Sequence, residues 1–156
     1  MNSLTDQFNN ITLKKVIDYY TMDDNGLINS HNVNDLRVNF SNIIRIYVIR
    51  EFYIVESTIF CTNLISIDGP GNVILIGNMA NKFSGLIHFI GGNCDRWDTS
   101  LVTNMTKMFS HNYSLNQHLN FDIRNVISIS SMFERADNLN PHNIMFYTDK
   151  DIDIDI

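Results

Sequence analysis

The chain has 156 residues, enough for one domain that buries a substantial core. Apolar residues make up 44% of the sequence and charged residues 18%, which excludes an intrinsically disordered chain. The net charge is -6 and the 11 basic residues are scattered, so neither a nucleic acid nor an anionic membrane surface is an expected partner.

The first predicted element is an amphipathic helix over residues 12–21. Its apolar side chains recur with helical spacing at Leu13, Val16, Ile17 and Tyr20. Thr12 is a suitable N-cap residue. We expect this helix and the strands that follow it to form a cap region over residues 1–56.

A polar turn follows at residues 23–26, which read Asp-Asp-Asn-Gly. The spacing resembles a calcium-binding EF-hand loop that begins at Thr21. Such a loop uses carboxylates at its first and twelfth positions, which here hold Thr21 and Asn32. We therefore interpret the segment as a turn that ends the helix, and we expect no metal site in the chain.

Residues 43–60 are rich in Ile, Val, Tyr and Phe, and apolar residues alternate from Ile44 to Val48. This pattern predicts one or two largely buried strands, although periodicity alone also allows a buried helix. Four charges interrupt the segment and argue against a membrane span: Arg45, Arg50, Glu51 and Glu56. The Gly-Pro-Gly sequence at residues 69–71 predicts a turn.

A 24-residue repeat dominates the second half of the chain. Residues 97–109 match residues 121–133, and every apolar position except Leu101 stays apolar. The matched pairs include Trp97 with Phe121, Val102 with Val126, Met105 with Ile129, and Met108-Phe109 with Met132-Phe133. A third copy begins at Asn78, and a degenerate fourth includes residues 57–60. The sequence thus predicts a solenoid of three clear or four repeats over residues 57–148.

Each repeat is expected to contain a short helix and a short strand. Helical spacing occurs at four apolar positions of the first half, Val102, Met105, Met108 and Phe109. The strand is expected in the second half, which contains Leu115, Leu119 and Phe121. Neither half can bury its apolar side alone, so stacking should align the strands into a parallel ladder backed by the helices. The expected fold class is α/β, a short leucine-rich-repeat-like solenoid with an N-terminal helix and strand cap.

The string at residues 97–109, followed by Leu115-Asn116-Gln117, resembles the WDTSxVTNMxxMF repeat of the BspA-like leucine-rich-repeat family. The resemblance is strong over residues 97–141 and fair over residues 76–96. Members of that family include bacterial surface proteins and paralogues encoded by large DNA viruses. The resemblance implies a solenoid for protein recognition or attachment without catalytic residues, because the motif consists of packing positions.

The first residues, Met1–Gln7, have neither the basic start nor the apolar stretch of a secretion signal. Surface members of the BspA-like family carry export signals. We therefore expect this chain to be a cytoplasmic or virion-associated relative.

Partner-binding residues are expected on either side of the repeated aromatic residue, because the neighbours of an inward side chain on a strand point outward. The candidates are Arg96 and Asp98 in one repeat, and Asn120 and Asp122 in the next. We expect a protein partner and a function in protein–protein recognition or scaffolding. One alternative is a structural component of a larger assembly such as a virus particle, with self-association through the solenoid ends. The other is an enzyme with an unrecognised site, although the sequence indicates no catalytic residue and no cofactor.

The remaining reactive residues form no recognised motif. No two histidines lie three or four positions apart, and Cys61 and Cys94 are interpreted as free thiols, with a single disulfide as the alternative. The tail at residues 149–156 alternates Asp and Ile after Lys150. It is expected to cap the solenoid by pairing with the last repeat, to add as a strand to a partner, or to remain a frayed acidic end.

Overall fold

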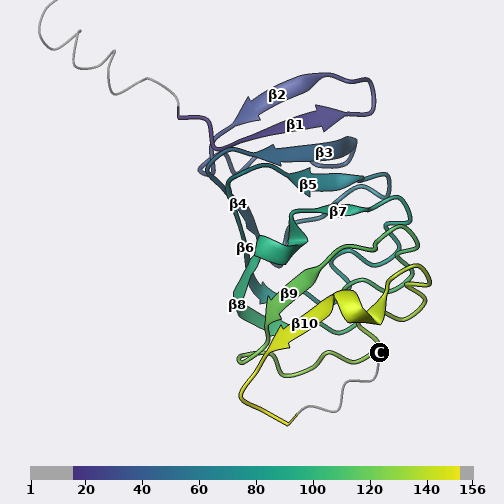
Figure 1. Ribbon diagram of the computed structural model, residues 1–156. Coiled ribbons are helices and arrows are strands. Elements are labelled where there is room, and N and C mark those ends of the chain that lie inside the picture. Colours follow the sequence, from purple (N-terminus) through teal and green to yellow (C-terminus); the bar gives the residue numbers. More distant parts are fainter. Residues whose placement is uncertain (1–15, 152–156) are drawn as a thin grey trace, which may run out of the picture.

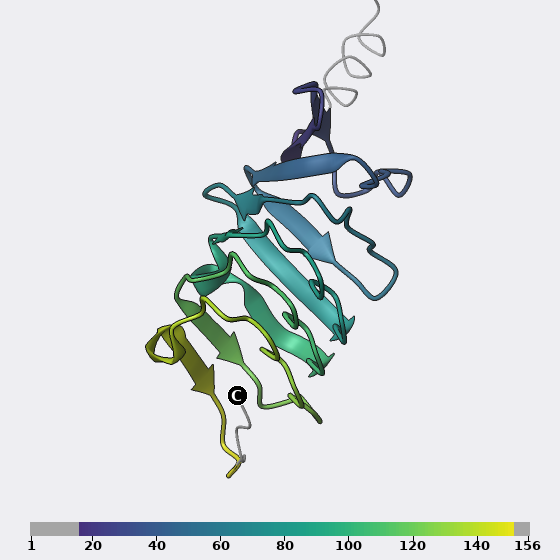
Figure 2. The ribbon, with the colours of Figure 1, turned by 90° about the vertical axis from the view of Figure 1, so that its right-hand side faces the viewer.

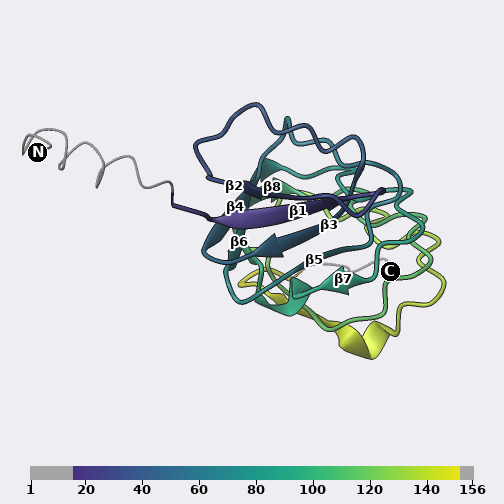
Figure 3. The same ribbon diagram turned by 90° about the horizontal axis from the view of Figure 1, so that it is seen from above.

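The protein is a β-solenoid of about four turns in the computed structural model, which describes residues 16–151 (Figure 1). The strands of the described chain are β1 (Tyr19–Asp23), β2 (Ile28–His31), β3 (Ile43–Val48), β4 (Glu51–Ile54), β5 (Ser66–Asp68), β6 (Asn72–Asn78), β7 (Gly91–Gly92), β8 (Asp98–Asn104), β9 (Leu119–Asp122) and β10 (Ile144–Tyr147). Two short 3₁₀ segments, η1 (Cys94–Arg96) and η2 (Pro141–Asn143), precede β8 and β10. Seen along the stack, the turns lie over one another around a shared interior (Figure 3).

Successive strands of one turn belong to different sheets. β3, β5 and β7 pair in parallel on one side, and β4, β6 and β8 pair in parallel on the next (Figure 2). β9 and β10 pair in parallel at the C-terminal end, where Leu119 faces Ile144 and Asp122 faces Tyr147. The predicted parallel ladder is therefore confirmed, and so is the prediction of strands within residues 43–60.

The third side of the solenoid consists of tight turns, so the helices predicted in the repeats are wrong. After β8 the chain turns twice at residues with left-handed backbone angles, Lys107 with φ 54° and His111 with φ 56°. Hydrogen bonds then join this side to the next turn, as from the Phe109 N–H to the Met132 carbonyl at 2.9 Å. Within residues 16–151 helix is limited to the two 3₁₀ segments, and the α/β class is replaced by a β-solenoid.

The helical spacing led to a wrong prediction because two consecutive tight turns of the backbone direct the same side chains inward as a helix would. Met105, Met108 and Phe109 are fully buried, as a helix would also require. A helix would satisfy their backbone groups locally, whereas here the alternate N–H groups bond to a turn that lies about 24 residues away. The pattern of burial is thus correctly predicted, and the backbone conformation is not.

An antiparallel hairpin occupies the N-terminal end, where the sequence predicted a helix. β1 pairs with β2 on one edge and with β3 on the other. Tyr19, Thr21 and Asp23 are buried in alternation, whereas Val16 of the supposed apolar stripe is 45% exposed. The prediction of a helix is therefore wrong for residues 16–21, and residues 12–15 lie outside the described residues.

Two predicted turns are confirmed. Residues 23–26 link β1 to β2, and Asp23 Oδ1 accepts the N–H groups of Asn25 at 2.9 Å and Leu27 at 2.8 Å. Residues 69–71 form the corner between β5 and β6. At Gly69, with φ 104°, an added Cβ would lie 2.2 Å from the Val48 carbonyl oxygen, so only glycine fits.

The core contains a column of stacked aromatic rings with one ring from each turn, Phe60, Phe83, Phe109 and Phe133. Successive ring centroids lie 5.3, 5.2 and 5.8 Å apart. Trp97 is also buried and donates its indole N–H to Asn93 Oδ1 at 2.9 Å. The expected core role of Trp97 and of the repeated Phe is confirmed.

The chain bends after β10 at residues 149 and 150. The alternating tail falls mainly on residues 152–156, which lie outside the described residues. Its pairing therefore stays a prediction.

Candidate protein-binding surface

The four predicted partner-binding residues lie on two neighbouring turns. Arg96 ends η1 and Asp98 begins β8, whereas Asn120 and Asp122 lie in β9. The aromatic residue between the members of each pair is buried, which turns its neighbours outward. The expected orientation is therefore seen: Arg96, Asp98 and Asn120 are exposed, and Asp122 is partly exposed.

β10 adds a third row to this surface. Because β9 and β10 pair in parallel, Met145 lies opposite Asn120 and Tyr147 lies opposite Asp122. Both side chains of the added row are well exposed, Met145 by 66% and Tyr147 by 59%. Neither residue was predicted from the sequence to bind a partner.

Arg96 and Asp98 are each held in place by hydrogen bonds. Arg96 Nη2 donates to the Gly69 carbonyl oxygen at 2.9 Å, which ties η1 to the preceding turn. Asp98 Oδ1 accepts the Ser100 hydroxyl at 2.6 Å and the Ser100 N–H at 3.0 Å. Their exposed atoms are thus presented in fixed positions.

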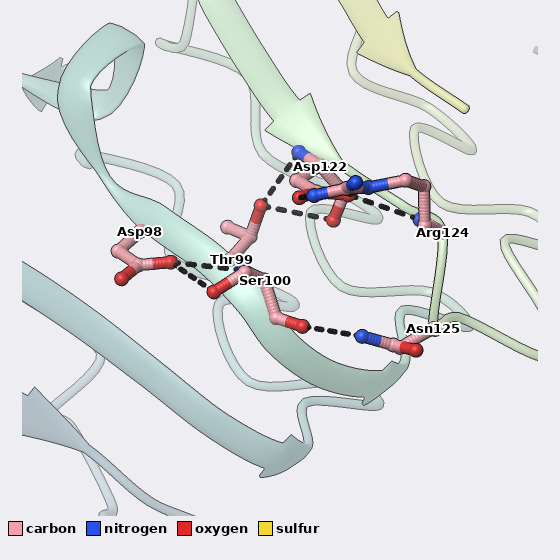
Figure 4. A network of polar contacts seen from close by, with 6 residues as sticks. All are labelled: Asp98, Thr99, Ser100, Asp122, Arg124 and Asn125. Carbon is pink, nitrogen blue, oxygen red and sulfur yellow. Dashed lines mark hydrogen bonds and ion pairs between the residues drawn. The ribbon is translucent and has the colours of Figure 1, made fainter. Parts of the chain in front are cut away.

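A polar network beneath this surface joins the turn that contains β8 to the turn that contains β9 (Figure 4). The buried Thr99 Oγ1 accepts the Asp122 N–H at 2.8 Å and lies 3.1 Å from the Asp122 carbonyl oxygen, to which it can donate. Asn125 Nδ2 donates to the Ser100 carbonyl oxygen at 2.8 Å. These bonds fix the position of Asp122 relative to β8.

Asp122 and Arg124 form the best-aligned ion pair of the described chain. Arg124 Nη2 lies 2.7 Å from Asp122 Oδ2, and its Nε lies 3.0 Å from Oδ1. The hydrogen bonds from the Arg124 side chain hold the pKa of Asp122 below its usual value, against the opposing effect of desolvation. The carboxylate is therefore charged throughout the physiological pH range.

The same guanidinium also covers Tyr147. The Arg124 Cζ atom lies 4.6 Å from the centre of the Tyr147 ring, which is cation–π geometry. We call the five outward residues of this region the C-terminal patch: Asn120, Asp122, Arg124, Met145 and Tyr147. The position of Arg124 two residues after Asp122, and the 25-residue step from β9 to β10, are the sequence signals that could have revealed the rest of the patch.

Two further hollows lie near the N-terminal end. A cleft of about 460 Å³ is lined by aromatic residues that include Tyr19, Phe40 and Phe52. A groove of about 430 Å³ on the outer face of β1 and β3 is lined by residues that include Tyr20 and Tyr47. Residues 16–151 contain no group of three side chains that could hold a metal ion.

The cysteines are both free thiols. Cys94 is completely buried, and burial raises its pKa well above the usual value. Cys61 is partly buried and its Sγ lies 3.3 Å from the Ile43 carbonyl oxygen. A neutral, enclosed thiol such as Cys94 is a packing group rather than a nucleophile.

The helical segments of the described residues span three residues each, far below the length needed to cross a membrane. Comparisons with curated proteins and with solved structures found no match. The sequence model of one family, described as "Mycoplasma protein of unknown function, DUF285", matches residues 60–155. Because this match covers more than half of the chain and includes β5 to β10, the chain belongs to the DUF285 family.

Proposed function

We propose that the protein is a non-enzymatic protein-recognition or scaffold module, and that it binds its partner through the C-terminal patch. The observation that carries the proposal is the arrangement of Arg124 between Asp122 and Tyr147. The resemblance of the repeat to BspA-like leucine-rich repeats supports the same class of function, because that family serves in recognition and attachment.

The composition of the patch suits a protein interface. Arg, Tyr and Met are enriched at interfaces, and Arg and Tyr are enriched among the residues that dominate binding energy. Arg124 is held on both sides, so binding would cost less side-chain entropy than for a free Arg. Its guanidinium still has exposed surface, since the side chain is 46% accessible.

The proposal can be tested by affinity capture from the native source with quantitative mass spectrometry. The double substitution Arg124→Ala with Tyr147→Ala should reduce recovery of the partner at least tenfold, because about 1.4 kcal/mol of lost binding energy is a factor of ten. The matched control removes an exposed Arg and Tyr at the other end of the molecule, Arg37→Ala with Tyr53→Ala. Equal recovery with both variants would exclude the patch as the binding site.

The two neighbouring candidates of the preceding turn are tested with a second variant in which Arg96 and Asp98 are both replaced by Ala. Loss of the partner with unchanged circular dichroism would extend the binding surface to the third turn. Unchanged capture would confine the surface to the region around Arg124 and Tyr147.

A second candidate function is a structural part of a larger assembly such as a virus particle. The observation in its favour is that β2 and β10 are edge strands at opposite ends of the stack, as edge strands offer backbone groups to another chain. Purified particles that contain the protein in fixed stoichiometry, together with concentration-dependent sedimentation, would favour this function. A monomer at all concentrations would count against it.

A further inference from the structure

The third side of the solenoid ends on a row of backbone N–H groups that have no acceptor among the described residues. In the preceding turn the N–H groups of this side bond to the turn below: Met105 to Ser128 O at 2.9 Å, Lys107 to Ser130 O at 3.0 Å, Phe109 to Met132 O at 2.9 Å and His111 to Glu134 O at 2.7 Å. One turn further, the equivalent donors are the N–H groups of Ile129, Ser131, Phe133 and Arg135. None of these four has an acceptor within residues 16–151. We call these four positions the terminal ledge.

The register of β10 predicts which residues lie next to the ledge. β10 pairs with β9 at a constant offset of 25 residues. The same offset places Asp151 opposite Val126, Asp153 opposite Ser128 and Ile154 opposite Ile129. A cavity of about 310 Å³ agrees with this register, because it is lined by residues 126–129 on one side and by Lys150 and Asp151 on the other.

The chemistry of the tail matches the columns that it would extend. Asn78, Asn104 and Ser128 occupy one corner column, and each side-chain oxygen accepts the N–H two residues later, at 2.9, 2.9 and 3.3 Å. Asp153 falls in this column, and a carboxylate oxygen can make the same bond. Asp is therefore a suitable residue for this corner.

The next column points into the core. Met79 and Met105 are fully buried, and Ile129 is 8% exposed. Ile154 falls in this column, whereas Ile152 falls opposite Ile127, which is 83% exposed. The register therefore places a carboxylate, Asp153, in the corner column and an apolar side chain, Ile154, in the inward column.

We propose that residues 152–156 dock on the terminal ledge of their own chain and continue the incomplete turn that β10 begins. Ile154 packs against Ile129, and the carbonyl groups of Asp153 and Asp155 accept the N–H groups of Ile129 and Ser131. This inference concerns how the solenoid ends and does not depend on the proposed recognition function. Docking of this kind would leave the C-terminal patch open while it removes two edge donors from contact with other chains.

Amide hydrogen exchange measured by NMR on the full-length chain tests the docking. Ile154→Asp places a charge in the inward column and should accelerate exchange of the Ile129 and Ser131 amides about fivefold, because a net hydrogen bond contributes about 1 kcal/mol. Ile152→Asp makes the same chemical change in the outward column and should leave both amides at wild-type rates. The Lys107 and Phe109 amides, which have partners within the solenoid, should not change in either variant.

Three results would overturn the proposal. Equal exchange at Ile129 and Ser131 in all three proteins would mean that the tail does not cover the ledge. Equal acceleration by Ile152→Asp and Ile154→Asp would contradict the register. Protection that appears only at high protein concentration would assign the ledge to a second copy of the chain.

Discussion

The aromatic column inside the solenoid keeps the same residue type from turn to turn, whereas the row of residues outside it does not. Inside, Phe83, Phe109 and Phe133 have the same chemistry in each turn, and their rings are parallel to within 9°. Outside, the equivalent position holds Asp98, then Asp122, then Tyr147. The inner position must pack against its own copy above and below, whereas the outer position meets solvent. Stability therefore depends on the repeated residues, and under the proposed recognition function the choice of partner would depend on those that change.

The largest effect is expected when the inner column is broken in its middle. Phe109→Ala should lower the free energy of unfolding by about 4 kcal/mol, because a fully buried ring is replaced by a cavity between two other rings. Tyr147→Ala, an aromatic truncation on the outer row, should cost less than about 1 kcal/mol. Urea denaturation measures both. Similar losses in the two variants would refute the division between inner and outer positions.

A smaller effect is expected from the corner glycine of the third turn. A Cβ added at Gly92, with φ 109°, would lie 2.1 Å from the Ile67 carbonyl oxygen, so Gly92→Ala should cost about 3 kcal/mol. Gly85→Ala is the matched control. Gly85 also has a positive φ of 72° but open space around it, and His111 and Arg135 fill the equivalent positions. Its substitution should cost about 1 kcal/mol, and a cost equal to that of Gly92→Ala would show that backbone angle rather than close approach limits these corners.

The corner column of Asx-type turns tests a weaker repeated interaction. Asn104→Ala removes the bond from the Thr106 N–H to Asn104 Oδ1 and should cost about 1 kcal/mol. Asn104→Ser should cost less than half of that, since Ser128 fills the same position one turn later and makes the same type of bond. Thermal unfolding of the two variants provides the measurement. A serine variant as unstable as the alanine variant would mean that the amide packs rather than bonds.

The contrast between inner and outer positions also explains what the sequence could predict. The repeat predicts burial correctly at Met105, Met108 and Phe109, because stacked copies must share an apolar interior. It does not predict the left-handed corners, because Asn81, Lys107 and Ser131 adopt the same conformation without a common side-chain chemistry. The hydrogen bonds that select this conformation come from a turn about 24 residues away, and helical spacing does not report them.

The N-terminal end shows the same limit. β1 buries the polar residues Thr21 and Asp23, so an apolar pattern cannot identify its inward face. The antiparallel pairing of β1 with β2 and β3 has no counterpart in the repeat. On the outer row, the orientation of the four candidates followed from their aromatic neighbours, but the role of Arg124 depended on its contact with Tyr147. That contact requires the 25-residue step of the last turn, which differs from the 24-residue repeat.

The smallest effect on stability is expected where the outer row is most ordered, at the pair of Asp122 and Arg124. Because Arg124 keeps the pKa of Asp122 low, the pair stabilises the fold at pH above the unfolded-state pKa of about 3.9. That contribution is lost as the pH falls through the lower pKa of the folded state. Arg124→Ala should therefore raise the pKa of Asp122 toward its ordinary value, with a smaller change in unfolding free energy than Asn104→Ala, since the half-exposed guanidinium is screened by water and salt.

Carboxyl ¹³C NMR titration measures this pKa directly. Arg96→Ala is the matched control, because it removes the same charge from the neighbouring turn while Arg96 contacts the Gly69 carbonyl group instead of Asp122. A pKa of Asp122 that rises equally in both variants would mean that the outer row acts through its summed charge rather than through one aligned pair. The charges of the C-terminal patch would then act only through their combined electrostatic potential. The fixed geometry of Arg124 would no longer support specific recognition.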